Sequence, residues 1–250
     1  MIVNSEEKRD HHRIQKLALG IPESRAYWHH IDPDASSAST SLQAFAERWY
    51  GPTTLARVRR LTAQMRARYN CFPNALAVLR TWNGMGVDTR RCICHWHLQL
   101  TDPMYRTFTG DLLVERRSAS APRIDRPAVI RWVRARGQGR WAETTVVQFG
   151  SKLLSAAAEA GLVSGGRDPR QLRFPRIPDD ALAYLLYLLR EVRFEGTLAD
   201  NPYLRSVGLD GFALDERLNR LPGLKHIRLG TVHEMAWDQP TISAWASEAL

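Results

Sequence analysis

The most reactive side chains of the sequence gather in the run CICHWH, which contains Cys92, Cys94, His95 and His97. Thiolates and imidazoles are common zinc ligands, and a structural zinc site needs four ligands that point at one ion. On a helix these positions spread over more than half of the circumference, and on a strand they divide between its two faces. No second ligand pair at zinc-finger spacing follows, since Cys71 lies upstream and His226 and His233 lie far downstream. We therefore expect no metal ion and no cofactor, and we expect the run to pack in the interior.

Carboxylates that could act as general acids or bases follow this run, at Asp102, Asp111 and Glu115. The chain contains none of the motifs GxSxG, GxGxxG or HExxH, and it contains no phosphate-binding P-loop. Glu115 directly precedes Arg116 and Arg117, which is typical of an ion pair at a helix end. The sequence therefore predicts a protein that is not an enzyme.

The charge of the chain is its most unusual bulk property. Lys and Arg total 35 and Asp and Glu total 26, which gives a formal net charge of +9 at pH 7. Almost all of the basic residues are Arg, a preference that codon bias can explain, although codon bias does not explain the net charge. A basic excess of this size favours a polyanionic partner such as a nucleic acid.

Cysteine usage and hydropathy indicate the cellular compartment of the protein. Three cysteines, an odd number, do not suggest a disulfide framework, which favours a reducing compartment. The N-terminal residues MIVNSEEKRDHHRIQ are charged and lack the apolar centre of a signal peptide. The longest apolar run, Ala181–Leu189, is too short to span a bilayer. We therefore expect a cytoplasmic protein that has no membrane partner.

The apolar periodicity predicts a mainly α fold, a helical bundle that includes a winged-helix segment of helix-turn-helix and short β-hairpin. Residues 1–40, which include the run HHIDPDASSASTS, are expected to form a flexible tail. Residues 41–120 are expected to form a helical domain, 121–178 the winged helix, and 179–250 a C-terminal helical region packed on the core. Within the last part, DALAYLLYLLREV is apolar nearly all round and predicts the central core helix.

The run TTLARVRRLTAQMRARY predicts a helix that is basic on one side. An apolar stripe includes Leu55, Val58 and Met65, and Arg57 and Arg60 lie opposite it. This basic side could contact phosphates, but for the helix alone a solvated surface is favoured.

The residues from 121 to 178 carry the functional prediction. The run RPAVIRWVRARG predicts a short amphipathic helix, and ARGQGR breaks it. A second helix follows over WAETTVVQFGSKLLSAAAEAGLV, and Gly161 is placed to end it. Its polar face, which can enter a DNA major groove without steric or charge conflict, bears Thr144, Gln148, Lys152, Ser155 and Glu159.

The run VSGGRDPRQLRFPRIP predicts a basic β-hairpin directly after this helix. Arginines on a two-stranded ribbon beside a recognition helix can reach the DNA backbone or the minor groove. The order of the elements predicts a winged helix that binds double-stranded DNA; the alternative is a purely structural helix pair or a protein-binding winged helix. The predicted DNA-binding residues are Arg140, Thr144, Thr145, Gln148, Lys152, Ser155, Arg167, Arg170, Arg173 and Arg176.

Roughly residues 42–180 resemble the BrxA-like family of BREX phage-defence systems. In that family a buried segment that contains a Phe and ends in Glu-Arg precedes a helix of the pattern W…T…L…EAGL. The matching residues here are Phe108, Glu115, Arg116, Trp141, Thr145, Leu154, Glu159, Ala160, Gly161 and Leu162.

The resemblance implies a helical, NusB-like or winged-helix DNA-binding protein without enzymatic activity, encoded among phage-defence genes. It also implies partners among the other subunits of such a system. Some members carry an inner-membrane label, which no segment of this sequence supports. A scaffold subunit that docks onto larger defence proteins without touching DNA remains the alternative function.

Overall fold

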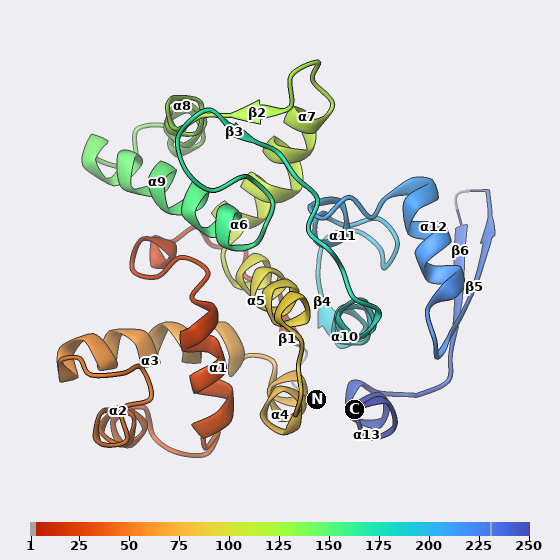
Figure 1. The fold of residues 1–250 in the computed structure, drawn as a ribbon, viewed down its shortest axis with the longest axis horizontal. Coiled ribbons are helices and arrows are strands. Elements are labelled where there is room, and N and C mark those ends of the chain that lie inside the picture. The colour runs from red at the N-terminus through yellow and green to blue at the C-terminus, as the bar shows by residue number, and fades with distance from the viewer. Residues whose placement is uncertain (1–3, 231) are drawn as a thin grey trace.

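The computed structural model describes residues 4–230 and 232–250, and the fold is mainly helical (Figure 1). Helices α5 (Val87–Thr101) and α10 (Asp179–Arg190) lie at the centre, with the other elements around them. Every residue of Ala181–Leu189 is buried, because α10 is apolar on all sides and is covered by neighbours on all sides. The prediction of a central core helix is confirmed.

Residues 4–40 pack against other elements rather than forming a flexible tail, so the prediction is wrong for them. Ile14, Leu19 and Tyr27 are almost fully buried. Ile14 and Leu19 lie outside the α-helices, and the buried stripe at Ser24, Tyr27 and Trp28 covers too few turns for the sequence to mark a helix clearly. The elements of this part are β1 (Asn4–Ser5), the 3-10 helix η1 (Arg13–Gln15), α1 (Ile21–His30) and α2 (Ser37–Ala46).

Two side-chain caps set the helix starts in the N-terminal part. Helix α2 begins four residues before the predicted start at Ser41, because the Ser36 hydroxyl accepts a hydrogen bond from the Ser39 amide. Thr54 caps α3 (Leu55–Tyr69) in the same way. Helix α4 (Pro73–Thr81) then leads to α5.

A second helical run follows α5 after a break at Asp102-Pro103. The Asp102 carboxylate accepts a hydrogen bond from the Tyr105 amide and so starts the new helix. The run contains one π-helical turn, which lies between two α-helical pieces. Its elements are α6 (Pro103–Thr107), the π-helical η2 (Phe108–Leu112) and α7 (Leu113–Arg117).

Residues 121–178 form the upper lobe in Figure 1, around α8 (Arg126–Gly137) and α9 (Glu143–Glu159). Both predicted helices are present. Gln138 adopts a left-handed conformation at the end of α8, and Gly161 does so after α9. Gly150 allows the two helices to pack closely, since a β-carbon there would lie 2.8 Å from Ile130 Cγ1.

Three short segments pair beside these helices. Strand β2 (Arg123–Ile124) is antiparallel to β3 (Arg170–Gln171), and an antiparallel bridge joins Leu172 to Val163. The segment 170–172 is therefore in the middle, between β2 and Val163. The sequence predicts the two segments after α9, but it does not predict β2, whose two residues are too few to show an alternating pattern.

The C-terminal part contains a β-hairpin, so the prediction of a purely helical region is wrong. Its strands are β5 (Leu224–Leu229) and β6 (Val232–Trp237), which pair in antiparallel register. One face of the hairpin packs on a helix and the other is exposed, so its apolar residues do not form the continuous run of a buried strand. The other elements are β4 (Val192–Arg193), which pairs in parallel with β1, and α11 (Pro202–Arg205), α12 (Gly211–Arg220) and α13 (Ile242–Ala249).

In the part of the chain that the structure describes, no helix is both long enough and apolar enough to cross a membrane.

Candidate nucleic-acid interface

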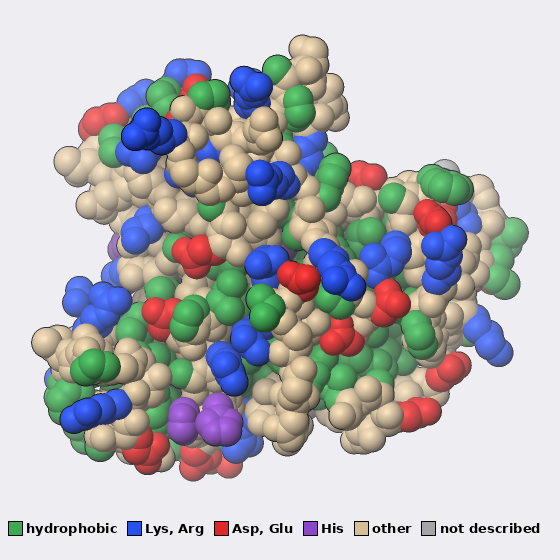
Figure 2. All heavy atoms as spheres, in the orientation of Figure 1, with side chains coloured by type: hydrophobic (Ala, Val, Ile, Leu, Met, Phe, Trp, Pro, Cys, Tyr) green, Lys and Arg blue, Asp and Glu red, His purple; other side chains and the backbone are tan. Residues whose placement is uncertain are grey.

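The net positive charge of the protein is concentrated in residues 121–178. This segment holds eleven Lys and Arg against four Asp and Glu, a net charge of +7 out of the +9 of the whole chain. In the view of Figure 2, Lys and Arg side chains outnumber Asp and Glu over the lobe that contains α8 and α9. A polyanion would therefore be attracted to this lobe more than to the rest of the surface.

The polar face that the sequence assigns to the second helix exists on α9. Thr144 and Gln148 are exposed, and Thr145, Lys152 and Ser155 are half-buried along the same side. The core stripe that includes Val146, Phe149 and Leu153 lies opposite and is fully buried. The helix thus presents hydrogen-bonding side chains to solvent over its N-terminal half.

The N-terminal segment lies along one edge of this polar face. The Gln15 side-chain amide donates a hydrogen bond to the Thr145 carbonyl oxygen at 3.1 Å, and the Gly20 amide donates to Glu159 Oε2 at 3.1 Å. These contacts partly cover Thr145 and Glu159. They leave the side of α9 that bears Thr144 and Gln148 open.

Arg140, which the sequence assigns to DNA binding, is paired within the protein. One of its terminal nitrogens lies 3.0 Å from Asp10 Oδ2, and its Nε donates to the Gly137 carbonyl oxygen. Its guanidinium also lies near the Trp141 ring. Because its side chain is still about half exposed, the ion pair with Asp10 would compete with any phosphate contact.

The four predicted wing arginines divide into one structural residue and three exposed ones. Arg170 is only 12% exposed; it pairs with Asp168 and donates to the Leu154 carbonyl oxygen, which ties the strand to α9. Arg167 lies exposed in the loop between Val163 and β3, while Arg173 and Arg176 lie exposed in the stretch after β3. The structure therefore leaves only Arg167 in the loop itself.

Four further exposed cations of this lobe are not identified by the sequence pattern. Arg123 lies on β2, and Arg126, Arg131 and Arg134 lie on α8, where Arg134 pairs with Glu143. The Arg126 amide donates to Asp168 Oδ2, which places the start of α8 beside the loop that carries Arg167. The run PRIDRP, with a buried Ile between two arginines, is the only sequence signal for this group.

The reactive run on α5 is buried, and its side chains do not converge. The Ser206 hydroxyl donates to the Tyr203 carbonyl oxygen, so His95 Nε2 donates to Ser206 and His95 Nδ1 accepts from the Tyr105 hydroxyl. His97 Nε2 instead lies 2.7 Å from the Tyr184 hydroxyl. The two histidines thus belong to separate hydrogen-bond groups.

Desolvation keeps the ionisable groups of this run uncharged. Burial lowers the pKa of both His95 and His97 to about 3, and it raises the pKa of the Cys92 thiol to about 12. The pKa of the Cys94 thiol is raised for the same reason. The run is therefore part of the core, as predicted.

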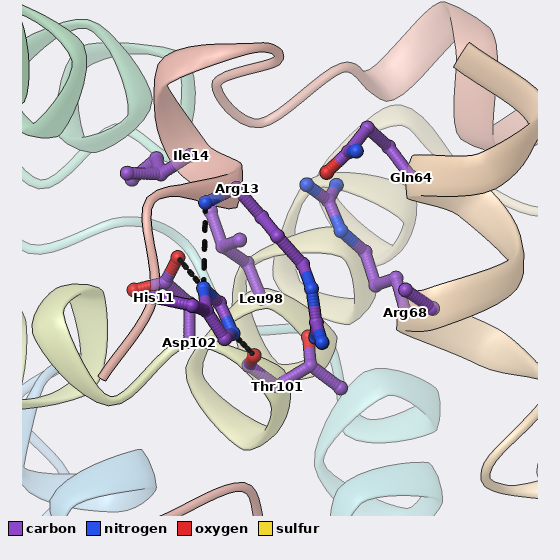
Figure 3. Close-up of a pocket in the computed structure, with 9 residues that line it drawn as sticks. His11, Arg13, Ile14, Gln64, Arg68, Leu98, Thr101 and Asp102 are labelled. Carbon is purple, nitrogen blue, oxygen red and sulfur yellow. Dashed lines mark hydrogen bonds and ion pairs between the residues drawn. The ribbon is translucent and has the colours of Figure 1, made fainter. Parts of the chain in front are cut away.

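The Asp102 side chain lies beside His11, next to a very small cavity. Figure 3 shows the His11 side chain against Asp102, with one ring nitrogen 2.8 Å from the Thr101 carbonyl oxygen and the other 3.7 Å from Asp102 Oδ2. Burial raises the pKa of this carboxyl group, and His11 opposes that shift. The adjoining cavity, about 10 Å³, has room for one water molecule and not for a substrate.

The other two candidate carboxylates lie on the surface. Asp111 on η2 lines a polar groove, and burial in that groove raises the pKa of its carboxyl group. Glu115 is exposed on α7. The ion pair predicted between Glu115 and the following arginines is not formed in the described part of the chain. Arg117 instead donates to the carbonyl oxygens of Ser206 and Arg173.

The comparisons with known proteins support the fold alone. No protein-family model and no curated protein sequence matches the chain. A solved structure described as an uncharacterized protein from Magnetospirillum magneticum is similar, with a TM-score of 0.62 and 15% sequence identity. The match covers 80% of this chain and 98% of the other. At this identity the similarity indicates a common helical architecture and carries no functional information.

Proposed function

We propose that the protein binds double-stranded DNA through a winged helix in residues 121–178 and catalyses no reaction. The order of elements supports this fold: helix α7, strand β2, helices α8 and α9, and two further strand segments, with the last strand in the middle of the sheet. A winged helix places its second helix beside such a sheet, with the loop between the last two strands projecting as a wing. Arg167 lies in that loop.

The observation that carries the proposal is that exposed cations and the exposed polar face of α9 belong to the same lobe. Arg126 lies beside the wing loop, at the start of the helix that packs on α9, and Arg167 and Arg173 lie at and after the wing. Cations near a helix that enters a major groove can neutralise the phosphates at its edges. Thr144 and Gln148 would then face base edges from the centre.

Membership of a phage-defence system rests on the resemblance to the BrxA-like family and is part of the proposal. Such a role is compatible with non-specific or weakly specific DNA binding, because phosphate contacts supply most of the affinity and little of the sequence information. We therefore expect similar affinities for unrelated duplexes of equal length.

A gel-shift experiment tests the proposal. The protein should retard a labelled 30-base-pair duplex, unlabelled duplex should compete, and polyglutamate at equal charge concentration should compete poorly. Arg167→Glu combined with Arg173→Glu should remove the shift while the far-ultraviolet circular dichroism stays unchanged. Absence of a shift for the wild-type protein at 50 mM salt would exclude DNA binding as its function.

A second function, docking onto a partner protein, is favoured by the outer face of the C-terminal hairpin. Ile227, Leu229 and Val232 are each more than half exposed there. Adjacent exposed apolar side chains are typical of a protein contact surface. Co-purification with products of neighbouring genes, lost on Leu229→Ser and without any DNA shift, would support this scaffold role instead.

A further inference from the structure

Two histidines that are far from the α5 run are brought together by the C-terminal hairpin. In the register of β5 and β6, His226 is opposite Met235 and His233 is opposite Arg228, so both rings lie diagonally on the same face. His226 Nε2 lies 2.9 Å from His233 Nδ1, and the ring planes are 21° apart. His226 Nε2 and His233 Nδ1 therefore face each other on this side of the hairpin.

A carboxylate from α12 completes this group. Asp215 Oδ1 lies 3.7 Å from His233 Nδ1, whereas Asp215 Oδ2 accepts a hydrogen bond from the Arg228 guanidinium. Among residues 4–230 and 232–250, the buried Oδ1 atom has no hydrogen-bond partner. A buried polar atom without a partner is costly, and it is a common sign of a ligand that completes the site.

The surroundings of His226 favour metal ligation through Nε2. Its Nδ1 lies 3.0 Å from Asn219 Oδ1, an acceptor that holds the ring proton on Nδ1, so Nε2 accepts the 2.9 Å hydrogen bond from His233 Nδ1 and could give the same lone pair to a metal ion. The ring of His226 thus has the tautomer and the outer hydrogen bond that metal sites use.

We propose that Asp215, His226 and His233 bind one divalent transition-metal ion, with Zn²⁺ as the preferred ion and water as the fourth ligand. The ligand atoms all lie within 4.8 Å of one another. A tetrahedral zinc ion with ligands at about 2.0–2.2 Å separates them by about 3.3–3.5 Å. The 2.9 Å and 3.7 Å separations bracket this range, so shifts of under one ångström suffice.

Two imidazoles and one carboxylate match the donor preference of zinc and exclude calcium or magnesium, which favour oxygen ligands. The ion would bridge α12 to both strands of the hairpin. It would therefore stabilise the C-terminal part of the protein without touching the surface proposed for DNA. The site is independent of the proposed function, and either can fail without the other.

The test uses the full-length protein without a polyhistidine tag, stripped with a chelator and titrated with Zn²⁺ in a calorimeter at pH 7.5. One ion should bind per chain. His226→Ala and His233→Ala should each weaken binding at least about 100-fold, and Asn219→Ala should weaken it about 10-fold. Co²⁺ should give the intense visible absorption of a four-coordinate nitrogen and oxygen site, and the His226→Ala variant should lose it.

The control is a second histidine pair, His29 and His30 on α1, whose ring centroids are 4.7 Å apart. His29→Ala with His30→Ala should leave zinc binding unchanged. Asp215→Asn, which keeps an acceptor for Arg228, should weaken zinc binding while the apo protein keeps its circular dichroism. Stoichiometric zinc binding that survives His226→Ala with His233→Ala, or no stoichiometric binding by the wild-type protein, would overturn the proposal.

Discussion

Two regions of the protein are rich in arginine, and the structure uses them differently. Helix α3 carries five arginines and no acidic residue over fifteen positions, a higher density than in residues 121–178. Yet the Arg68 side chain is buried and donates to the carbonyl oxygens of Ala18 and Leu19, and Arg66 donates to the carbonyl oxygen of Ala35. Part of the charge of α3 thus holds the N-terminal segment in place.

Helix α3 leaves Arg57, Arg59 and Arg60 exposed, whereas residues 121–178 leave a larger number of arginines exposed on the lobe that carries the polar face of α9. Arg170 has a structural role similar to that of Arg68, but Arg126, Arg167 and Arg173 remain exposed on one lobe. The comparison shows that charge density in a sequence does not by itself identify a binding surface. What matters is how many cations remain exposed after packing, and whether a polar helix face lies among them.

The largest effect is expected for the buried arginine of α3. Arg68→Met should lower the free energy of unfolding by about 3 kcal/mol, because it leaves two buried carbonyl oxygens without donors and loosens the N-terminal segment. Arg57→Met, at an exposed position of the same helix, should change it by less than about 0.5 kcal/mol. Urea denaturation measures both. Equal losses of unfolding free energy for the two variants would contradict a structural role for Arg68 that Arg57 lacks.

Charge reversal in the two regions should separate them by function. Arg167→Glu with Arg173→Glu should weaken binding to a 30-base-pair duplex about 100-fold at 0.1 M salt, since each lost phosphate contact costs about tenfold there. Arg57→Glu with Arg60→Glu in α3 changes the net charge equally and should weaken binding less than about threefold. Fluorescence anisotropy measures both, and similar losses would indicate that only the total charge matters.

Arg170 should behave as a structural residue despite its place among the wing arginines. Arg170→Ala removes its ion pair with Asp168 and its bond to the Leu154 carbonyl oxygen, so it should lower the free energy of unfolding by about 1.5 kcal/mol. Arg173→Ala should leave stability unchanged within about 0.5 kcal/mol. Thermal unfolding followed by circular dichroism distinguishes the two, and a stable Arg170→Ala protein would contradict the assignment.

The smallest effects are expected on the polar face of α9. Thr144→Ala and Gln148→Ala should each weaken duplex binding about two- to fivefold at most, because base-edge contacts without sequence preference add little to phosphate contacts. Val147→Ala, also exposed on α9, is the control and should have no effect. A loss above tenfold at Gln148 would instead indicate sequence-specific readout, which a panel of duplexes would reveal.

The sequence predicts best those parts of the fold in which one helix buries a continuous stripe. The core face of α9 and the fully buried α10 both follow from periodicity. Residues 4–40 escape it because Ile14 and Leu19 lie outside the α-helices and the buried stripe of α1 that includes Tyr27 is short. The sequence also cannot distinguish the structural wing arginine from the exposed ones. Arg170 differs from Arg173 only through its contacts with Asp168 and Leu154 in the folded protein.

Clusters of side chains that could bind a metal ion are also hard to predict from the sequence. Cys92, Cys94, His95 and His97 are adjacent in sequence but take separate partners around a buried helix. His226 and His233 are distant from them and meet only because of the hairpin register. A strand pairing that the sequence does not predict therefore creates a ligand group that the sequence does not predict either.

The salt dependence of duplex binding measures the phosphate contacts directly. With about six phosphates neutralised around α9, the logarithm of the association constant should fall against the logarithm of salt concentration with a slope of about −5. Arg167→Glu with Arg173→Glu should make the slope shallower by about 2, and Arg57→Glu with Arg60→Glu should leave it unchanged. A slope near zero for the wild-type protein, or the same slope for both double variants, would contradict DNA binding through residues 121–178.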